Sequence, residues 1–279
     1  MRILLTGAGG QLGRDLQEAL KGHDLRAFDH AGLDIADREA VLRTVEEVHP
    51  DWIINAAAFN DVDAAEAMTD AAFAVNGAGP GHVAEAAAVV GASIVHISSD
   101  YVFDGTKGTP YTEDDIPNPL SVYARSKYEG ETRVLESAAS ACVLRTAWLY
   151  GRHGKNFVKA ILAAAARGGP IKVVADQVGS PTATADLAQA IAQFLQTPAR
   201  GLFHVANAGA CSRFEFAQAI VQGSVEVLPT TTAEAARPAL RPANSSLGSV
   251  RWQESGLTPL SSWRSALDAF LESLPNPAG

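Results

Sequence analysis

The hydrophobic pattern of the first half of the chain alternates between short apolar runs and longer segments of helical period. Five apolar runs predict buried strands, at 2–6, 25–28, 51–55, 93–98 and 142–148. Between them, apolar residues recur every three or four positions, as at Leu12, Leu16 and Leu20, which predicts amphipathic helices. Strands separated by crossovers of helix length form right-handed βαβ units. The pattern therefore predicts an α/β fold with a doubly wound parallel sheet covered on both faces.

The pattern changes after about Gly151. Helices are expected over 157–167, 184–196 and 213–221, and short strands over 171–175 and 202–207. The segment 228–249 is rich in Pro, Ser, Thr and Ala and is expected to be irregular. A last helix is expected to open at Thr258-Pro259 and to run to about Leu271, because proline is favoured in the first helical turn.

Composition and charge exclude several classes of protein. The 279 residues are 47% hydrophobic and 19% charged, which is typical of a globular chain with ample material for a core. The formal charge of −9 argues against a nucleic-acid partner, and no apolar stretch reaches the roughly 18 residues of a membrane span. Cys142 and Cys211 lie in apolar stretches without metal-ligand spacing, so we expect buried thiols. These features predict a cytoplasmic protein without a membrane partner.

A glycine-rich loop follows the first strand and opens the first helix. Gly7, Gly10 and Gly13 form a G-x-x-G-x-x-G pattern, in which backbone amides and the positive end of a helix hold a pyrophosphate. Asp29 ends the second strand, where an acid accepts hydrogen bonds from the adenosine ribose. Because this carboxylate would repel a 2′-phosphate, it favours NADH, while NADPH stays open. A solvated loop acid is the alternative interpretation of Asp29.

This loop determines how the two halves are interpreted. We expect a Rossmann-type dinucleotide-binding domain over 1–150. The smaller C-terminal α/β part, over 151–279, is expected to be mainly substrate-binding, with room for some of its segments to return to the Rossmann sheet. Extra packing without a binding role is the alternative for this part.

A tyrosine and a lysine lie four residues apart at the start of a predicted helix. The spacing of Tyr123 and Lys127 puts phenol and ammonium on one helix face, about 5–6 Å apart at Cβ. Lys127 is expected to lower the pKa of Tyr123 by favouring the phenolate, so that the tyrosine can donate a proton to an alkoxide. A surface tyrosine stacked on the lysine stem is the alternative.

A serine pair ends the fourth predicted strand. Ligands bind at the carboxyl ends of strands in open α/β sheets, so a hydroxyl at Ser99 can hold a reacting oxygen beside the phenol of Tyr123. Ser98 is the rival, and alternation along the strand does not choose between the two.

The order of these motifs resembles that of extended short-chain dehydrogenase/reductases. Further segments are similar to those of dTDP-4-dehydrorhamnose reductases: NAAA at 55–58 with VDAAE at 62–66, HISSDYVFDG at 96–105, DQVGSPT at 176–182 and RPANS at 241–245. The resemblance covers nearly the whole chain. It implies the last step of dTDP-L-rhamnose synthesis, in which NADPH or NADH reduces the 4-keto group of dTDP-4-dehydro-6-deoxy-L-mannose.

The resemblance also implies roles for individual residues. Ser99, Tyr123 and Lys127 would form the catalytic triad, which chooses Ser99 over Ser98. Asp100 and Trp148 would join Ser99 and Tyr123 at the sugar nucleotide. Lys127 and Tyr123 would also contact the cofactor, together with Gly7, Gly10, Gln11, Leu12, Gly13, Asp29, Asp34, Ile35, Ala57 and Ala58.

The chain departs from the resembled pattern at several places. Ser99 stands where many relatives have Thr, which keeps the hydroxyl, and Phe59-Asn60 replaces the more usual aromatic or His followed by Thr. Arg213-Phe214 stands where Trp-Tyr is common. The resemblance includes homodimers linked through Mg²⁺, and Asp15 occupies one of the acidic positions involved. We expect a homodimer on this basis but predict no metal site.

Two other functions stay open. One is an epimerase or dehydratase that recycles bound NAD, although such dehydratases carry Asp-Glu after the catalytic hydroxyl and this chain has Asp100-Tyr101. The other is a non-catalytic subunit resembling the partner of methionine adenosyltransferase, which would not need the triad that stands here.

Several polar and aromatic residues are expected to be structural. We interpret His96 as a core histidine on an apolar strand, and Trp52, Trp252 and Trp263 as core anchors. The acidic segment 113–115 is expected to be a solvated loop face rather than a metal cluster, and its Pro-flanked position is also compatible with a mobile lid.

Overall fold

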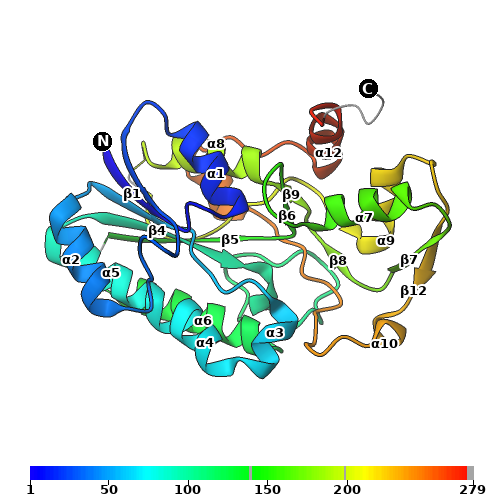
Figure 1. The fold of residues 1–279 in the computed structure, drawn as a ribbon, viewed down its shortest axis with the longest axis horizontal. Helices are drawn as coiled ribbons and strands as arrows, with labels where there is room; N and C mark the ends of the chain where they lie inside the picture. Colours follow the sequence, from blue (N-terminus) through cyan, green and yellow to red (C-terminus); the bar gives the residue numbers. More distant parts are fainter. Residues whose placement is uncertain (138–139, 198, 275–279) are drawn as a thin grey trace.

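The computed structural model describes residues 1–137, 140–197 and 199–274, and a six-stranded sheet lies at its centre (Figure 1). The strand order is β10-β5-β4-β3-β1-β2, and every neighbouring pair is parallel. These strands are β1 (Arg2–Thr6), β2 (Asp24–Phe28), β3 (Trp52–Asn55), β4 (Ser93–Ser99), β5 (Ser140–Thr146) and β10 (Gly201–His204). The predicted α/β fold with a doubly wound parallel sheet is confirmed.

Helices cover both faces of the sheet (Figure 1). On one face, α1 (Gln11–Ala19) packs against α8 (Thr184–Phe194) over a fully apolar core. The other face is covered by α2 (Arg38–Val48), α5 (Gly79–Val90) and α6 (Val122–Leu135), which enclose a second core. Strands buried on both faces explain why the sequence shows continuous apolar runs there rather than alternation.

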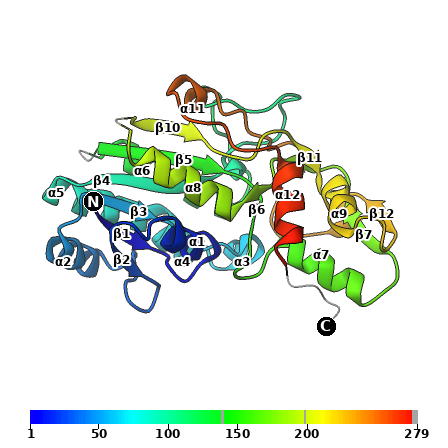
Figure 2. The ribbon, with the colours of Figure 1, turned by 90° about the horizontal axis from the view of Figure 1, so that it is seen from above.

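The second half of the chain contributes to both parts of the molecule. α8 and β10 return to the large sheet, where β10 is the edge strand beside β5. The remainder surrounds a separate core formed by α7 (Phe157–Ala166), α9 (Arg213–Val221) and α12 (Trp263–Glu272). Figure 2 shows these three helices beyond one end of the sheet. The domain boundary at 150/151 stays a prediction.

Short strand pairs complete the smaller part. They join β7 (Ile171–Val174) to β12 (Val227–Thr230), β8 (Val178–Gly179) to β11 (Cys211–Ser212), and β6 (Leu149–Tyr150) to β9 (Thr182–Ala183). The segment 228–249 is therefore not irregular throughout, since it contains most of β12 and the helix α10 (Thr232–Ala235). That expectation is wrong because Thr231 forms a capping box with Glu234, which starts a helix inside the polar stretch.

The last helix also begins later than expected. It starts at Trp263 rather than at Pro259, because the side chain of Ser262 accepts a hydrogen bond from the amide of Ser265 and caps the helix there. The short helices α3 (Val62–Ala67) and α11 (Val250–Glu254) have no counterpart in the predicted pattern.

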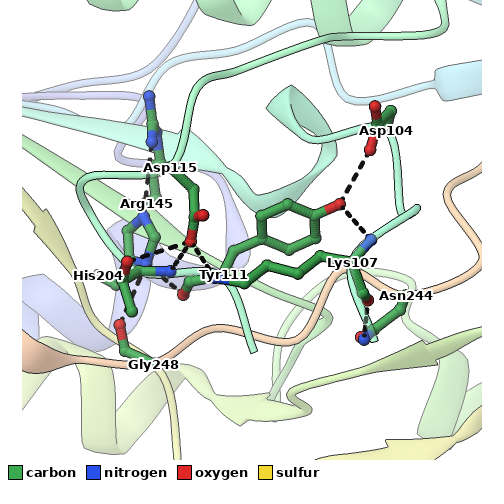
Figure 3. Close-up of polar contacts among 9 residues, drawn as sticks. Asp104, Lys107, Tyr111, Asp115, Arg145, His204, Asn244 and Gly248 are labelled. Carbon is green, nitrogen blue, oxygen red and sulfur yellow. Dashed lines mark hydrogen bonds and ion pairs between the residues drawn. The ribbon is translucent and has the colours of Figure 1, made fainter. Parts of the chain in front are cut away.

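The acidic segment 113–115 is solvated only at Asp114, whose side chain is 84% exposed, so the expectation of a solvated face is wrong for its two neighbours. Glu113 is 5% exposed, and its carboxylate accepts from the backbone amide of His204 at 2.9 Å. The carboxylate of Asp115 accepts from the ammonium of Lys107 (Figure 3). The segment therefore fastens its loop to the edge strand β10 instead of facing water along its length.

The residues expected to be structural are otherwise placed as predicted. His96, Trp52 and Trp252 are buried, and Trp263 packs at the border of the separate core formed by α7, α9 and α12. Cys142 and Cys211 are buried free thiols. Over the described parts of the chain, no helix has the length and apolar character needed to cross a membrane.

Candidate active site

The glycine-rich loop between β1 and α1 requires close contact between backbones. Gly7 has a φ of +70°, and a Cβ there would lie 2.5 Å from the backbone of Ala56, just after β3. A Cβ on Gly13 would lie 2.2 Å from the carbonyl oxygen of Gly7. Only glycine fits at these positions, and the loop brings the amides at the start of α1 to the edge where the strand order reverses. This is the cradle that a pyrophosphate requires.

A cavity of about 590 Å³ opens on one side of the loop. Its walls include six residues predicted around the cofactor: Gly7, Asp29, Asp34, Ile35, Ala57 and Ala58. The carboxylate of Asp29 lies just after β2, where its Oδ1 accepts from the amide of Gly32 at 3.0 Å. An acid fixed at this point has the position expected for a ribose acceptor.

A second cavity, of about 350 Å³, opens on the other side of the loop over the ends of β4 and β5. Its walls include the remaining predicted residues: Gly10, Gln11, Leu12, Gly13, Ser99, Asp100, Tyr123, Lys127 and Trp148. Gly10, Ala56, Ala58 and Asn60 line both cavities. The two cavities therefore adjoin at the phosphate loop, which fits a dinucleotide with one base on each side. The structure brings all the predicted site residues together, and their roles stay predictions.

Lys127 is buried on α6 and held by the strand that carries the serines. Its ammonium donates to the carbonyl oxygen of Ile97 at 2.7 Å, and the residue is 2% exposed. Burial lowers the pKa of Lys127 to about 8, while the negative charge of Glu131, one turn along α6, acts to raise it. Lys127 thus keeps a fixed position but holds its proton less firmly than an exposed lysine.

Tyr123 lies one turn before Lys127, as the spacing predicts, but its pKa moves the opposite way from the expectation. Burial raises the pKa of the Tyr123 phenol above its usual value, and a hydrogen bond with Ser99 lowers it only in part. The negative charge of Asp100 acts in the same direction as burial. The expected lowering of this pKa by Lys127 is not found: desolvation of the phenolate is the largest effect, and Lys127 is not among the groups that shift it.

The two serines at the end of β4 have different partners. The hydroxyl of Ser98 donates to the buried carboxylate of Glu131, which is also held by the guanidinium of Arg145. The hydroxyl of Ser99 accepts from the amide of Tyr101 at 3.1 Å and interacts with the phenol of Tyr123. Ser98 is therefore committed to a buried ion pair, which leaves Ser99 as the hydroxyl next to the phenol.

Asp100 is a buried carboxyl group at the floor of the same cavity. It is 2% exposed and accepts hydrogen bonds from Ser99 at 3.1 Å and from Ser245. Burial raises the pKa of Asp100 to about 6, against the opposing effects of both hydroxyls and the charge of Arg213. Asp100 thus connects the cavity to Ser245, the last residue of the RPANS segment at 241–245.

Arg213 lines the same cavity, and no function was assigned to it in the sequence analysis. It begins α9, and its guanidinium lies 3.4 Å from the centre of the Trp148 ring, with Phe157 at 5.0 Å. Trp148 has a φ of +46°, and a Cβ on Gly179 would lie 2.3 Å from its ring, so that glycine makes room for the indole. The stacked pair forms the wall of the cavity that faces the smaller part.

Comparison with known proteins identifies the family. A family model described as the RmlD substrate binding domain matches residues 1–275. The dTDP-4-dehydrorhamnose reductase of Mycobacterium tuberculosis (strain H37Rv) is 45% identical over 287 residues, covering 99% of this chain and 94% of that protein. The chain belongs to the dTDP-4-dehydrorhamnose reductase family.

Other members of this family agree in sequence and structure. The structure of dTDP-4-dehydrorhamnose reductase from Bacillus anthracis in complex with NADP has a TM-score of 0.95 and 41% identity, covering 98% of this chain and 99% of that one. A protein of Streptomyces antibioticus described as a probable dTDP-4,6-dihydroxy-2-methyloxan-3-one 4-ketoreductase is 44% identical over 279 residues, covering 97% of this chain and 95% of that protein.

The family resemblance in sequence did not reveal the contacts that support α6, the helix that carries Tyr123 and Lys127. A π-helical turn, η1 (Ala74–Ala78), carries the buried Asn76, whose side chain binds the backbone of Phe59 and donates to Ser126 of α6 at 3.1 Å. The carboxylate of Glu66 accepts from the first amide of α6 at 2.8 Å. For the contacts of Asn76, the one signal in the sequence is an isolated Asn in an Ala-rich segment.

Proposed function

We propose that the protein reduces the 4-keto group of dTDP-4-dehydro-6-deoxy-L-mannose to give dTDP-L-rhamnose, with NADPH or NADH as the reductant. The observation that carries the proposal is the meeting of Ser99, Tyr123 and Lys127 in a cavity that adjoins the dinucleotide cavity. The name of the Mycobacterium tuberculosis relative and the NADP complex of the Bacillus anthracis enzyme support the substrate and the cofactor.

The reaction needs a proton for the sugar oxygen and stabilisation of its developing charge. When bound, the reduced cofactor supplies a hydride to the ketone carbon. The phenol of Tyr123 donates its proton to the carbonyl oxygen, and the hydroxyl of Ser99 turns from Asp100 to donate a hydrogen bond to the same oxygen. The ammonium of Lys127, fixed on the Ile97 carbonyl, stabilises the phenolate that this transfer leaves. Gly10 and Gln11, at the start of α1, hold the pyrophosphate.

A basic cavity beside the reaction cavity supports a nucleotide-linked substrate. Its volume is about 540 Å³, and it shares Tyr101, Lys155 and Arg213 with the reaction cavity. Its further basic residues are Lys172, Arg237 and Arg241, of which the two arginines share an ion pair with Asp63, in a chain whose formal charge is −9. A diphosphate carries two negative charges at neutral pH, so the proposal puts the diphosphate of the sugar nucleotide here and its sugar below Trp148.

An absorbance assay tests this function. The purified protein is mixed with NADPH or NADH and with dTDP-4-keto-6-deoxy sugar, in the presence of the isomerising enzyme that forms the L-configured ketone. The proposal predicts oxidation of the cofactor that requires both the sugar and the protein. A protein that binds both ligands but oxidises no cofactor would support a regulatory role instead.

The proposal includes two further properties of the protein. We infer a homodimer from the family resemblance and a cytoplasmic location from the composition and charge of the sequence. Mass measurement in solution and cell fractionation test them separately from the activity.

A further inference from the structure

A smaller hollow lies on the far side of Asp29 from the cofactor cavity. Its volume is about 350 Å³, and its walls include Gly9, Arg14, Phe28, Asp29 and Gly32. Gly9 and Asp29 also line the 590 Å³ cavity, so the two spaces share a border at the end of β2. This border is where the ribose of a bound dinucleotide would present its 2′ substituent to the protein.

We propose that Arg14 recognises the 2′-phosphate of NADPH at this border, an inference that rests on the proposed function. Arg14 follows the last glycine of the phosphate loop, and its exposed side chain reaches back so that Nε donates to the carbonyl of Gly9 at 3.4 Å. A Cβ placed on Gly9 would lie 3.4 Å from the Cβ of Asp29, so Gly9 is in contact with that acid. Arg14 and Asp29 therefore line the same hollow, with Gly9 in contact with both.

The donors of Arg14 suit a phosphate. A guanidinium has five N–H donors, and in the described parts of the chain Gly9 is the one hydrogen-bond partner found for this side chain. Over the same residues no ion pair joins Arg14 to Asp29. Arg14 therefore keeps donors for a doubly charged group that would lie at the ribose, where a planar guanidinium can bind two phosphate oxygens at once.

Asp29 would favour the binding of NADH, and Arg14 would favour the binding of NADPH. The carboxylate of Asp29 accepts from the free 2′-hydroxyl of NADH and repels the 2′-phosphate of NADPH. The charge of Arg14 offsets that repulsion and adds hydrogen bonds only when the phosphate is present. The NADH preference expected from Asp29 alone is then cancelled, and both cofactors can bind.

Calorimetry on the cofactor-free protein tests this assignment without any reaction. The probes are 2′,5′-ADP, which carries the 2′-phosphate, and 5′-AMP, which carries the hydroxyl. Arg14→Gln is expected to weaken 2′,5′-ADP about 10- to 100-fold, as for the loss of a charge-assisted hydrogen bond, and to leave 5′-AMP within about twofold. Asp29→Ala is expected to have the opposite effect, with weaker 5′-AMP and tighter 2′,5′-ADP.

A matched control separates local contact from net charge. Arg43→Gln removes the same charge from the exposed surface of α2, at a residue that lines none of the four cavities described above, and is expected to leave the binding of both ligands unchanged. Equal weakening by Arg14→Gln and Arg43→Gln, or equal loss of both ligands in Arg14→Gln, would overturn the role of Arg14. If the wild-type protein bound neither ligand, the proposed function itself would be overturned.

Discussion

Burial acts on Tyr123 and Lys127 in opposite directions, and both shifts favour the neutral form. It raises the pKa of the phenol and lowers the pKa of the lysine to about 8. Reduction begins with a neutral phenol, because Tyr123 must donate a proton rather than accept one. A raised pKa in the protein alone is therefore compatible with an acid role. Lys127 matters most once the phenolate has formed, because its ammonium is a fixed positive charge in the same cavity.

Removing the phenolic hydroxyl separates proton donation from binding. Tyr123→Phe keeps the ring and its packing but cannot protonate the alkoxide, so we expect turnover to fall by about 10²- to 10⁴-fold. Cofactor binding should stay within about twofold of wild type. The measurements are steady-state kinetics with the keto sugar and calorimetry with NADPH. Tyr128→Phe on the same helix is the control, and a Tyr123→Phe protein with near-normal turnover would refute the assignment.

The sequence predicted which residues line the two cavities but not which of them contact one another. The motifs chose Tyr123 and Lys127 by spacing alone, and both line the cavity. Ser98 and Ser99 could not be separated from the residues alone because both are buried at the end of one strand, and what distinguishes them is the distant carboxylate of Glu131. The stacking of Arg213 on Trp148 joins residues far apart in the sequence and leaves no local signal.

The helix α6, which carries Tyr123 and Lys127, packs closely against the π-helical turn η1. A Cβ on Gly130 would lie 2.1 Å from the carbonyl oxygen of Asn76, so the two elements touch through backbone atoms. Asn76 completes the contact by donating to Ser126. A π-helical turn widens a helix by one residue, and such turns are frequent at functional sites. Here the wide turn places the Asn76 amide between the Phe59 loop and α6.

Gly130→Ala adds a methyl group between α6 and η1 and so tests how closely their backbones pack. Gly130→Ala should gain up to about 1 kcal/mol from helix propensity if nothing opposed it. The clash with Asn76 is between backbone atoms and cannot be relieved by a rotamer, so we expect a net loss of about 1–3 kcal/mol. Urea unfolding measures the difference. Gly22→Ala, where a Cβ meets nothing within 4 Å, should change little; a stabilised Gly130→Ala protein would show that the contact is loose.

Element types were easier to predict from the sequence than element ends. The helix over 213–221 and the strand over 2–6 match the observed bounds, because a cap residue or a continuous apolar run marks them locally. The start of α12 was misplaced because Pro259 satisfies the same first-turn rule as a helical proline, while the cap that acts is Ser262. The turn η1 follows from packing against α6, and no local pattern encodes it.

On the scale of the whole molecule, a buried polar cluster connects the edge strand β10 to the loop after β4 (Figure 3). His204 of β10 contacts the carbonyl oxygens of Tyr111 and Gly248 through Nδ1, at 3.1 and 3.2 Å. Tyr111 in turn donates its hydroxyl to Asp104 at 2.9 Å. The cluster joins segments from both halves of the chain, and it lies outside the proposed reaction cavity.

This cluster should make stability sensitive to acid. Burial lowers the pKa of His204 to about 3, so the folded protein leaves it neutral while the unfolded chain protonates it near pH 6.5. Stability from this group is fully present above pH 6.5 and is lost as the pH falls toward 3. The expected slope is up to about 1.4 kcal/mol per pH unit, from one additional proton bound on unfolding.

A non-titrating side chain isolates that contribution. His204→Gln should be less stable than wild type at pH 7, and the gap should narrow steadily when urea unfolding is repeated at pH 6 and pH 5. His30→Gln, at a side chain that is 82% exposed, should leave the slope unchanged. If the unfolding free energies of wild type and His204→Gln fell with pH at the same rate, the burial of a neutral histidine at this position would be contradicted.

The overall topology was only partly accessible from the sequence. Repeated βαβ units predicted the parallel sheet, but the pairing of β10 with β5 joins segments about 60 residues apart and depends on long-range packing. The adjoining cavities likewise arise from several elements, and their residues were gathered by resemblance of motifs rather than by local pattern.

The central claim is a direct hydride transfer from the cofactor to carbon 4 of the sugar, with Tyr123 as the proton donor. Cofactor deuterated at the transferable position of nicotinamide carbon 4 tests it most directly. After reaction with the keto sugar, the position of deuterium in the product is read by NMR and mass spectrometry. The account predicts one deuterium at carbon 4 of dTDP-L-rhamnose for each cofactor oxidised. A product without deuterium, or with deuterium at another carbon, would contradict it.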